Sequence, residues 1–423
     1  MANIFDYLDW RDIELKKVEF NEIDNLILSR LSYLPLDGIV KNEEISIKDA
    51  YKKYQGLEKK GKFLWDGDEE LFLRLSRSKR FGSMKLTYYV NKIDVLQEKQ
   101  FSGVSIVMPD ETIYVAFRGT DNTIVGWKED FNMCFSELVP AQIDAVKYLE
   151  NVAKKYNKKI RVGGHSKGGN LAVYASAFCN SKIKERIINV YNNDGPGFCD
   201  RVIKSEEYKN ILDKVHTYIP QSSIIGRLLN HEEKTTILKS TQTGIMQHDL
   251  YSWQVLGDKF IETKATNSSE FIDKTITNWL KEVSVEQRAA CIDILFEVLN
   301  STKAETLSEI NDNKFANMKA MLKTYKNIIG RTHSYIPKSS VIGRLLNHKE
   351  ETTVVESTQT GIMQHDLYSW QVLGDKFIET EITNSSEFVA FVSINLSPST
   401  CQEYKSCCII PVCVLSIIVV FSL

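Results

Sequence analysis

The sequence is poor in cysteine, lacks an excess of either charge and has few long apolar runs. Its eight cysteines among 423 residues form no CxxC pair, so we expect no metal site. Lys plus Arg number 53 and Asp plus Glu 55, and the net charge of -2 gives no electrostatic reason to expect nucleic acid as a partner. The first residues also lack the basic start and apolar core of a signal peptide, which predicts a cytoplasmic protein.

The one long apolar run, 409–421, lies at the end of the chain. It is shorter than the roughly 20 apolar residues that span a bilayer, and it contains Pro411. We therefore expect residues 389–423 to form an apolar, cysteine-containing tail that is either disordered or in contact with a membrane.

Two of the glycines flank a serine at positions 164–168, which read Gly-His-Ser-Lys-Gly. The preceding segment 158–163 is typical of a short strand, and the following segment 170–178 is typical of a helix with small and apolar faces. A G-x-S-x-G turn between a strand and a helix forms a nucleophile elbow, in which the serine is held in a strained backbone conformation. Ser166 is therefore the candidate nucleophile. The alternative is a structural turn with an idle serine.

The neighbours of Ser166 supply the rest of this turn. Gly164 and Gly168 are needed because a Cβ two residues from the serine would collide with the elbow. The first N–H groups of the new helix have no partner within it, so the backbone N–H of Lys167 is a candidate oxyanion donor. The second donor should come from the loop after an earlier strand, where Thr120 offers both an N–H and a hydroxyl.

The seven histidines of the chain leave few choices for a general base. His165 lies inside the elbow and is expected to point away from this role. His248 follows the last expected strand. Proteins with a G-x-S-x-G elbow carry their catalytic histidine there, because the chain order of their triad is serine, acid, histidine. We therefore favour His248, with a capping or core histidine as the alternative. The weaker candidates are His216 and His231, with His365 competing only if a second copy of its segment displaced the first.

The candidate acid is Asp194, which follows the strand after the nucleophile in a glycine-rich turn. This position could aim the carboxylate at the base. The alternative is an Asx-turn residue that bonds only its own backbone, as aspartate before glycine often does. The other candidates are Asp200, Asp213 and Asp249.

Strand and helix patterns alternate through the middle of the chain, which predicts an α/β fold. We expect an α/β-hydrolase-type, mostly parallel sheet flanked by helices, with an N-terminal helical segment and a C-terminal helical extension. The expected parts are an N-terminal helical segment packing on the core (1–80), the hydrolase core (81–271), a helical extension (272–330), a duplicated copy of 214–271 (331–388) and the tail (389–423).

The duplication is plain in the sequence, because residues 216–271 recur almost unchanged as residues 333–388. A solenoid needs at least three stacking units, and unrelated sequence separates these two copies. We interpret the second copy as a recent insertion.

Several motifs resemble known families. Similarity to the class 3, fungal-type lipases of the α/β-hydrolase superfamily is carried by 116–120 (Ala-Phe-Arg-Gly-Thr), Trp127, Asp130 and 164–169. Closer similarity, over about residues 1–330, is to the bacterial Mbeg-like family of lipase-like proteins, and it is carried by 3–10, 193–198 and 247–249.

This resemblance implies that Ser166 is the nucleophile, His248 the base, and Thr120 with Lys167 the oxyanion hole. The chain departs from the lipases in two places. They carry leucine where this chain has Lys167, and such a lysine either favours an anionic substrate at a pocket mouth or is a solvated surface residue. Their acid follows a later strand, where this chain reads Pro-Gln-Ser-Ser at 220–223, so Asp194 must substitute or the triad is incomplete.

The sequence thus predicts a serine hydrolase that cleaves a small-molecule or lipid carboxylic ester through an acyl-serine intermediate and needs no cofactor. The alternative is a catalytically inactive protein of the same fold that serves as an interaction or membrane-associated scaffold.

Overall fold

The computed structural model describes residues 2–133, 136, 138–266, 284–306, 309–310, 316–317, 320–321, 323–324, 367–373 and 376–382. The chain divides into two compact units, Met1–Lys274 and Thr275–Leu423.

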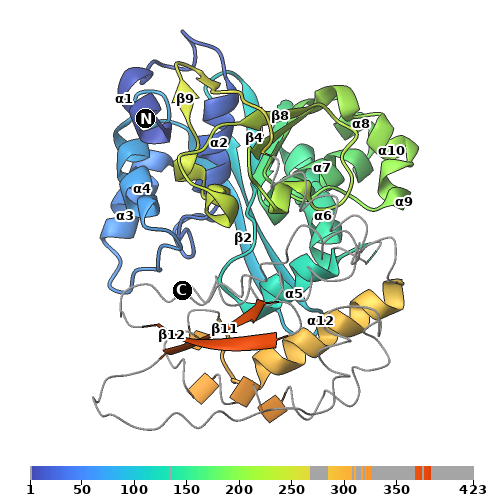
Figure 1. Ribbon diagram of the computed structural model, residues 1–423. Helices are drawn as coiled ribbons and strands as arrows, with labels where there is room; N and C mark the ends of the chain where they lie inside the picture. The colour runs from blue at the N-terminus through green and yellow to red at the C-terminus, as the bar shows by residue number, and fades with distance from the viewer. Residues whose placement is uncertain are drawn as a thin grey trace. The chain divides into compact units, whose positions relative to one another are not determined.

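The first unit is built on an eight-stranded sheet with its strands in sequence order from β1 to β8 (Figure 1). Strands β1 to β4 pair antiparallel, whereas β4 to β8 pair parallel, as in the expected α/β-hydrolase-type sheet. The strands are β1 (Ile45–Ser46), β2 (Lys85–Asp94), β3 (Lys99–Val107), β4 (Thr112–Phe117), β5 (Lys159–His165), β6 (Ile187–Asn193), β7 (Val215–Pro220) and β8 (Thr235–Leu238).

Helices cover both faces of this sheet, and the sequence of β4 shows why. All six residues of β4 are buried. Successive side chains of a strand point to opposite faces, so Tyr114 and Ala116 join one hydrophobic cluster while Ile113 and Val115 join the other. A strand buried on both sides reads as a continuous apolar run rather than an alternating one.

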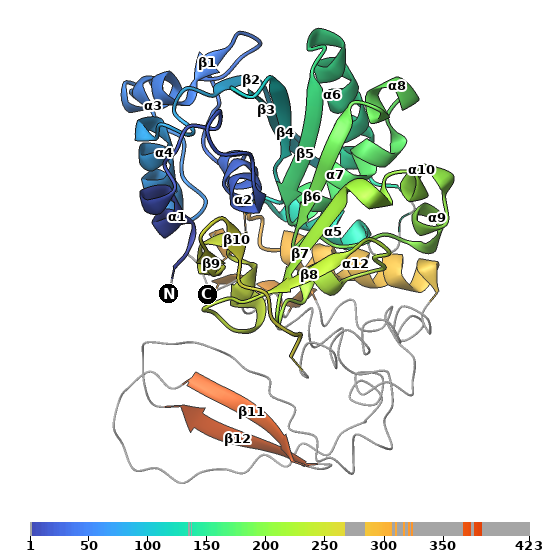
Figure 2. The ribbon, with the colours of Figure 1, turned by 90° about the horizontal axis from the view of Figure 1, so that it is seen from above.

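The first cluster is closed by α1 (Ile4–Trp10), α2 (Glu22–Leu31), α3 (Ile47–Gln55) and α4 (Gly67–Arg77), and Figure 2 shows these helices on one side of the sheet. Asn21 caps the start of α2, since its side chain accepts hydrogen bonds from the N–H groups of Ile23 and Asp24. The carboxylate of Asp24 accepts from the N–H of Asn21, which completes a capping box.

The opposite face carries α6 (Pro140–Lys155) and α7 (Lys167–Phe178), and α5 (Ile124–Asn132) packs near the ends of β2 and β3. The shorter elements of this unit are α8 (Ser181–Lys184), α9 (Asp200–Ile203), α10 (Glu206–Lys209), η1 (Leu212–Lys214), η2 (Ile225–Arg227), η3 (Gly244–His248), η4 (Leu250–Ser252), β9 (Val255–Leu256) and β10 (Lys259–Phe260). The strand expected at 158–163 and the helix expected at 170–178 are confirmed within a few residues.

In the second unit the structure describes one long helix, α12 (Val285–Asn300), and a hairpin of β11 (Leu367–Leu373) and β12 (Lys376–Ile382). A capping box of Ser284 and Gln287 begins α12. The apolar tail 389–423 lies outside the described residues. Over the described part of the chain, every helix is too short or too polar to cross a bilayer.

Candidate active site

Ser166 sits in a strained turn between β5 and α7, with φ of 59° and ψ of -134°. A positive φ is uncommon for a residue other than glycine and carries strain that the surrounding structure has to hold in place. The flanking glycines allow it, because a Cβ at Gly164 would overlap the backbone of Gly168, and one at Gly168 would overlap the carbonyl of Phe117. The expected strand, tight turn and helix around the serine are present.

The loop after β4 lies directly against this turn. A Cβ added at Gly119 would stand 2.9 Å from the Cβ of Ser166 and 2.6 Å from the carbonyl oxygen of His165. Gly119 therefore permits a close approach that another residue would block, and Thr120 follows it at the side of the elbow. The hydroxyl of Thr120 donates a hydrogen bond to Asp130 of α5.

His248 and Asp194 meet at the same edge of the sheet. The Nδ1 atom of His248, at the end of η3, lies 2.7 Å from Oδ2 of Asp194. Asp194 follows β6, is fully buried and has a φ of 53°. A carboxylate that accepts from Nδ1 fixes the imidazole orientation and leaves Nε2 for another partner.

The second oxygen of Asp194 accepts a hydrogen bond of 2.6 Å from the hydroxyl of Ser223. Ser223 follows β7, so the loops after β6 and β7 meet at this carboxylate. Asp194 is not the Asx-turn residue of its loop. The side chain that bonds the backbone of this loop is that of Asn192, which accepts from the N–H of Gly195 at 2.9 Å.

The ring of His165 packs against the ring of His248. Its Nε2 lies 2.9 Å from the carbonyl oxygen of His248, and the two rings are 4.3 Å apart. Burial lowers the pKa of His165 well below its ordinary value, with the neighbouring His248 and Arg30 adding to the effect. A neutral ring that donates from Nε2 to this carbonyl accepts at Nδ1, where the hydroxyl of Tyr33 lies 3.0 Å away.

Both interpretations of the Lys167 side chain that the sequence suggested are wrong. It is neither solvated nor at a pocket mouth, because it is only 1% exposed and its Nζ lies 3.1 Å from the carboxylate of Glu129. The sequence held a weak signal of this, since the residue follows the nucleophile at the start of a helix whose remaining surface is apolar.

The other candidate residues make contacts elsewhere. His216 bonds Asn189 at 3.1 Å, and His231 bonds the buried carboxylate of Glu233 at 2.8 Å. Asp249 caps η4 through the N–H of Tyr251. Asp200 and Asp213 are exposed, and His365 lies outside the described residues.

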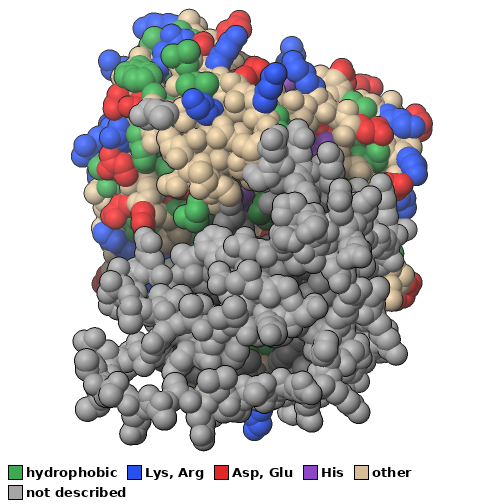
Figure 3. All heavy atoms as spheres, in the orientation of Figure 1, with side chains coloured by type: hydrophobic (Ala, Val, Ile, Leu, Met, Phe, Trp, Pro, Cys, Tyr) green, Lys and Arg blue, Asp and Glu red, His purple; other side chains and the backbone are tan. Residues whose placement is uncertain are grey.

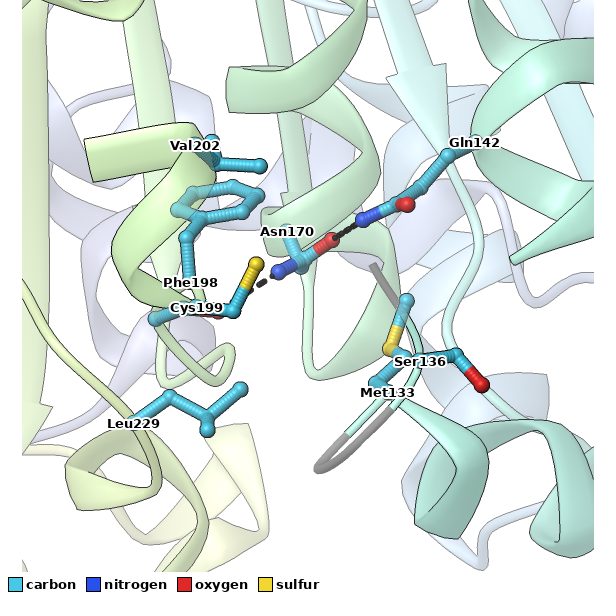
Figure 4. A pocket seen from close by; sticks show the side chains of 9 residues that line it. Met133, Ser136, Gln142, Asn170, Phe198, Cys199, Val202 and Leu229 are labelled. Carbon is cyan, nitrogen blue, oxygen red and sulfur yellow. Dashed lines mark hydrogen bonds between the residues drawn. The ribbon is translucent and has the colours of Figure 1, made fainter. Parts of the chain in front are cut away.

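A small hollow opens beside the first turn of α7 (Figure 4). Its apolar wall comes from Met133, Phe198, Val202 and Leu229. Asn170, one turn beyond Ser166, crosses it and is held in place by two hydrogen bonds of 2.9 Å, from the side chain of Gln142 and to the carbonyl of Gly197.

Basic and acidic side chains are intermixed over the described surface that Figure 3 shows. Among the residues that the structure describes, no group of three or more His, Cys, Asp and Glu side chains is arranged to hold a metal ion.

A mostly parallel sheet with a strained serine between strand and helix, and with later loops that bring an acid and a histidine together, defines the class of the α/β-hydrolases. The Mbeg1-like family matches residues 75–297 and 311–397, well over half of the chain. The chain belongs to the Mbeg1-like family, and the resemblance seen in the sequence is confirmed.

Similar solved structures include lipases of two fungi. The native Rhizomucor miehei lipase propeptide complex is 15% identical over 56% of this chain and 79% of its own, with a TM-score of 0.34. Lipase II from Rhizopus niveus is 16% identical over 44% of this chain and 83% of its own, with a TM-score of 0.31. No curated protein matches the chain.

Proposed function

We propose that the protein is a serine hydrolase that cleaves a carboxylic ester through an acyl-serine intermediate. The hydrogen bond of 2.7 Å between His248 Nδ1 and Asp194 carries this proposal, because it supplies an oriented base on the sheet edge where Ser166 is strained. An idle histidine bonded to Asp194 would leave the backbone strain at Ser166 unexplained, because strain of this kind is typical of functional sites.

In the proposed reaction the Oγ of Ser166 attacks the acyl carbon while Nε2 of His248 takes its proton. The backbone N–H groups of Lys167 and Thr120 donate to the oxygen that becomes negative. The intermediate collapses when His248 returns the proton to the leaving alcohol. Water then attacks the acyl-serine by the same route in reverse, releasing the acid and restoring Ser166.

The proposed substrate is a small-molecule or lipid ester. No step of this reaction calls for a cofactor. The inactive-scaffold alternative rested on the missing acid after β7. The contacts of Ser223 and His248 with Asp194 support Asp194 as the acid instead.

The test is hydrolysis of a series of nitrophenyl esters by the purified full chain. Ser166→Ala should lower kcat by about a thousandfold or more, because the groups of a triad act as a unit. Ser181→Ala, which changes an exposed serine of α8, is the matched control and should keep full activity. Equal hydrolysis by the wild type and Ser166→Ala would contradict the proposal.

A further inference from the structure

The ammonium group of Lys167 is buried in a polar cluster behind the proposed oxyanion hole. Its Nζ lies 3.0 Å from the carbonyl oxygen of Gln100 and 3.1 Å from Oε2 of Glu129. Glu129 is fully buried, and its carboxylate also accepts from the N–H groups of Gln100 and Ala141, each at 2.9 Å. The lysine therefore connects the start of α7 with β3 and α5.

A second carboxylate extends this cluster to the other side of the hole. Oδ1 of Asp130 lies 3.5 Å from Nζ of Lys167, and the other carboxylate oxygen of Asp130 accepts from the hydroxyl of Thr120. Burial raises the pKa of Asp130 to about 6, although the charge of Lys167 and the bond from Thr120 oppose that rise. The path from Lys167 through Asp130 to Thr120 joins the two residues whose N–H groups are the proposed donors.

Stability alone gives no reason for a lysine here. Buried ion pairs are often replaced by apolar residues without loss of stability, because desolvation offsets most of the attraction. A role that needs the charge explains the lysine better than packing does.

We propose that Lys167 is a positioning residue whose ammonium, acting through Asp130, holds Thr120 in place for oxyanion binding. This inference rests on the proposed hydrolase function. Lys167 then has two roles in the oxyanion hole. Its backbone N–H donates to the oxyanion, and its side chain fixes the loop that carries the second donor. A small displacement of a donor weakens a bond that matters most in the transition state, so kcat should change and KM should not.

The experiment is a double-mutant cycle between Lys167 and Thr120. Lys167→Met is combined with Glu129→Gln, so that the fully buried carboxylate of Glu129 is not left without its cation, and Thr120→Val removes the hydroxyl that bonds Asp130. Each should lower kcat by about 10- to 100-fold at unchanged KM. Because both break the same path, adding Thr120→Val to the Lys167→Met/Glu129→Gln protein should lower kcat little further. Thr120→Ser, which keeps the hydroxyl, should restore most of the loss seen in Thr120→Val.

Thermal unfolding identifies the variants that keep the native fold. If the methionine variant unfolds, Lys167→Gln with Glu129→Gln replaces it, since two amides preserve hydrogen bonding in the cluster. Two results would overturn the inference while leaving the proposed hydrolase function standing. One is a combined variant whose loss of kcat is the product of the two separate losses, and the other is full kcat in a folded Lys167→Met/Glu129→Gln protein. A wild-type protein that neither hydrolyses esters nor reacts with a fluorophosphonate would instead overturn the proposed function, and the inference with it.

Discussion

The chain carries nearly the same segment twice, and the two copies occupy different surroundings. The first, residues 216–271, belongs to the unit Met1–Lys274 and contributes its last sheet strand and His248. The second, residues 333–388, belongs to the unit Thr275–Leu423, where the hairpin of β11 and β12 is its described part. A comparison of the two copies shows which features of the secondary structure follow from the local sequence and which follow from packing against the rest of the unit.

Both copies pair these strands in the same register. Leu256 pairs with Lys259 in the first copy, and the equivalent Leu373 pairs with Lys376 in the second. The lengths of the strands differ, since β9 and β10 have 2 residues each whereas β11 and β12 have 7 each. The register is therefore a local property of the sequence, whereas the length of the ladder is not.

Packing in the first unit explains the shorter ladder there. Trp253 is fully buried, and its Nε1 donates to the carbonyl of Gln247 at 2.8 Å. Leu250–Ser252 forms the short 3-10 helix η4 instead of a strand. Tertiary contacts thus override the strand preference of an almost identical sequence, and they bring His248 beside Asp194.

The largest expected effect separates the two equivalent histidines. His248→Ala should lower kcat/KM for ester hydrolysis by about a thousandfold or more, because it removes the base and its bond to Asp194. His365→Ala, the matched control, should leave kcat/KM unchanged. Similar losses in both variants would show that the copies exchange roles.

The second prediction concerns the packing of the two tryptophans. Trp253→Ala should lower the free energy of unfolding of the first unit by about 3–5 kcal/mol, because it empties a fully buried site. Trp370→Ala should leave that transition in place. The measurement is urea-induced unfolding followed by circular dichroism, and equal losses in the two variants would contradict the comparison.

The third prediction uses Glu233, whose second-copy equivalent is Glu350. Burial alone would raise the pKa of Glu233, but hydrogen bonds from His231, Thr217 and Tyr208 hold it at about 2. A carboxyl with a depressed folded-state pKa stabilises the fold above its unfolded pKa, and this contribution is lost as pH falls toward 2.

Glu233→Gln should therefore lower the free energy of unfolding by about 3 kcal/mol at pH 7, and this difference from the wild type should shrink as the pH approaches 2. Glu350→Gln should show no such dependence. Denaturant titrations at pH 7 and pH 3 give both values, and a pH-independent loss in Glu233→Gln would argue against the depressed pKa.

The smallest effect is expected at Ser223, because its hydroxyl bonds the proposed acid, Asp194. Ser223→Ala removes one of the hydrogen bonds to Asp194 and should lower kcat by about 3- to 30-fold, equivalent to roughly 1–2 kcal/mol. Ser340→Ala is the control in the second copy. A full loss of activity in Ser223→Ala would mean that the hydroxyl acts in the reaction itself.

Local signals in the sequence were enough to predict the scaffold. The alternation of strand and helix patterns predicted the α/β sheet, and the glycines around Ser166 located the elbow. Each of these depends on residues close together in the chain, where backbone geometry and propensity act directly.

Contacts between distant segments were harder to predict. The sequence showed that the usual acid after β7 was missing, but not that Ser223 there would bond Asp194 from 29 residues away. The burial of Lys167 depends on Glu129 of α5, and the placement of His165 depends on Tyr33 in the N-terminal segment. Nothing in the residues adjacent to the elbow specifies such partners.

The most direct test of the site is the rate at which a fluorophosphonate labels the full chain, with the labelled peptide identified by mass spectrometry. We predict rapid labelling at Ser166 in the wild type and in His365→Ala, and labelling at least a hundredfold slower in His248→Ala. Equal labelling rates in the wild type and His248→Ala, or a label on another residue, would contradict the account.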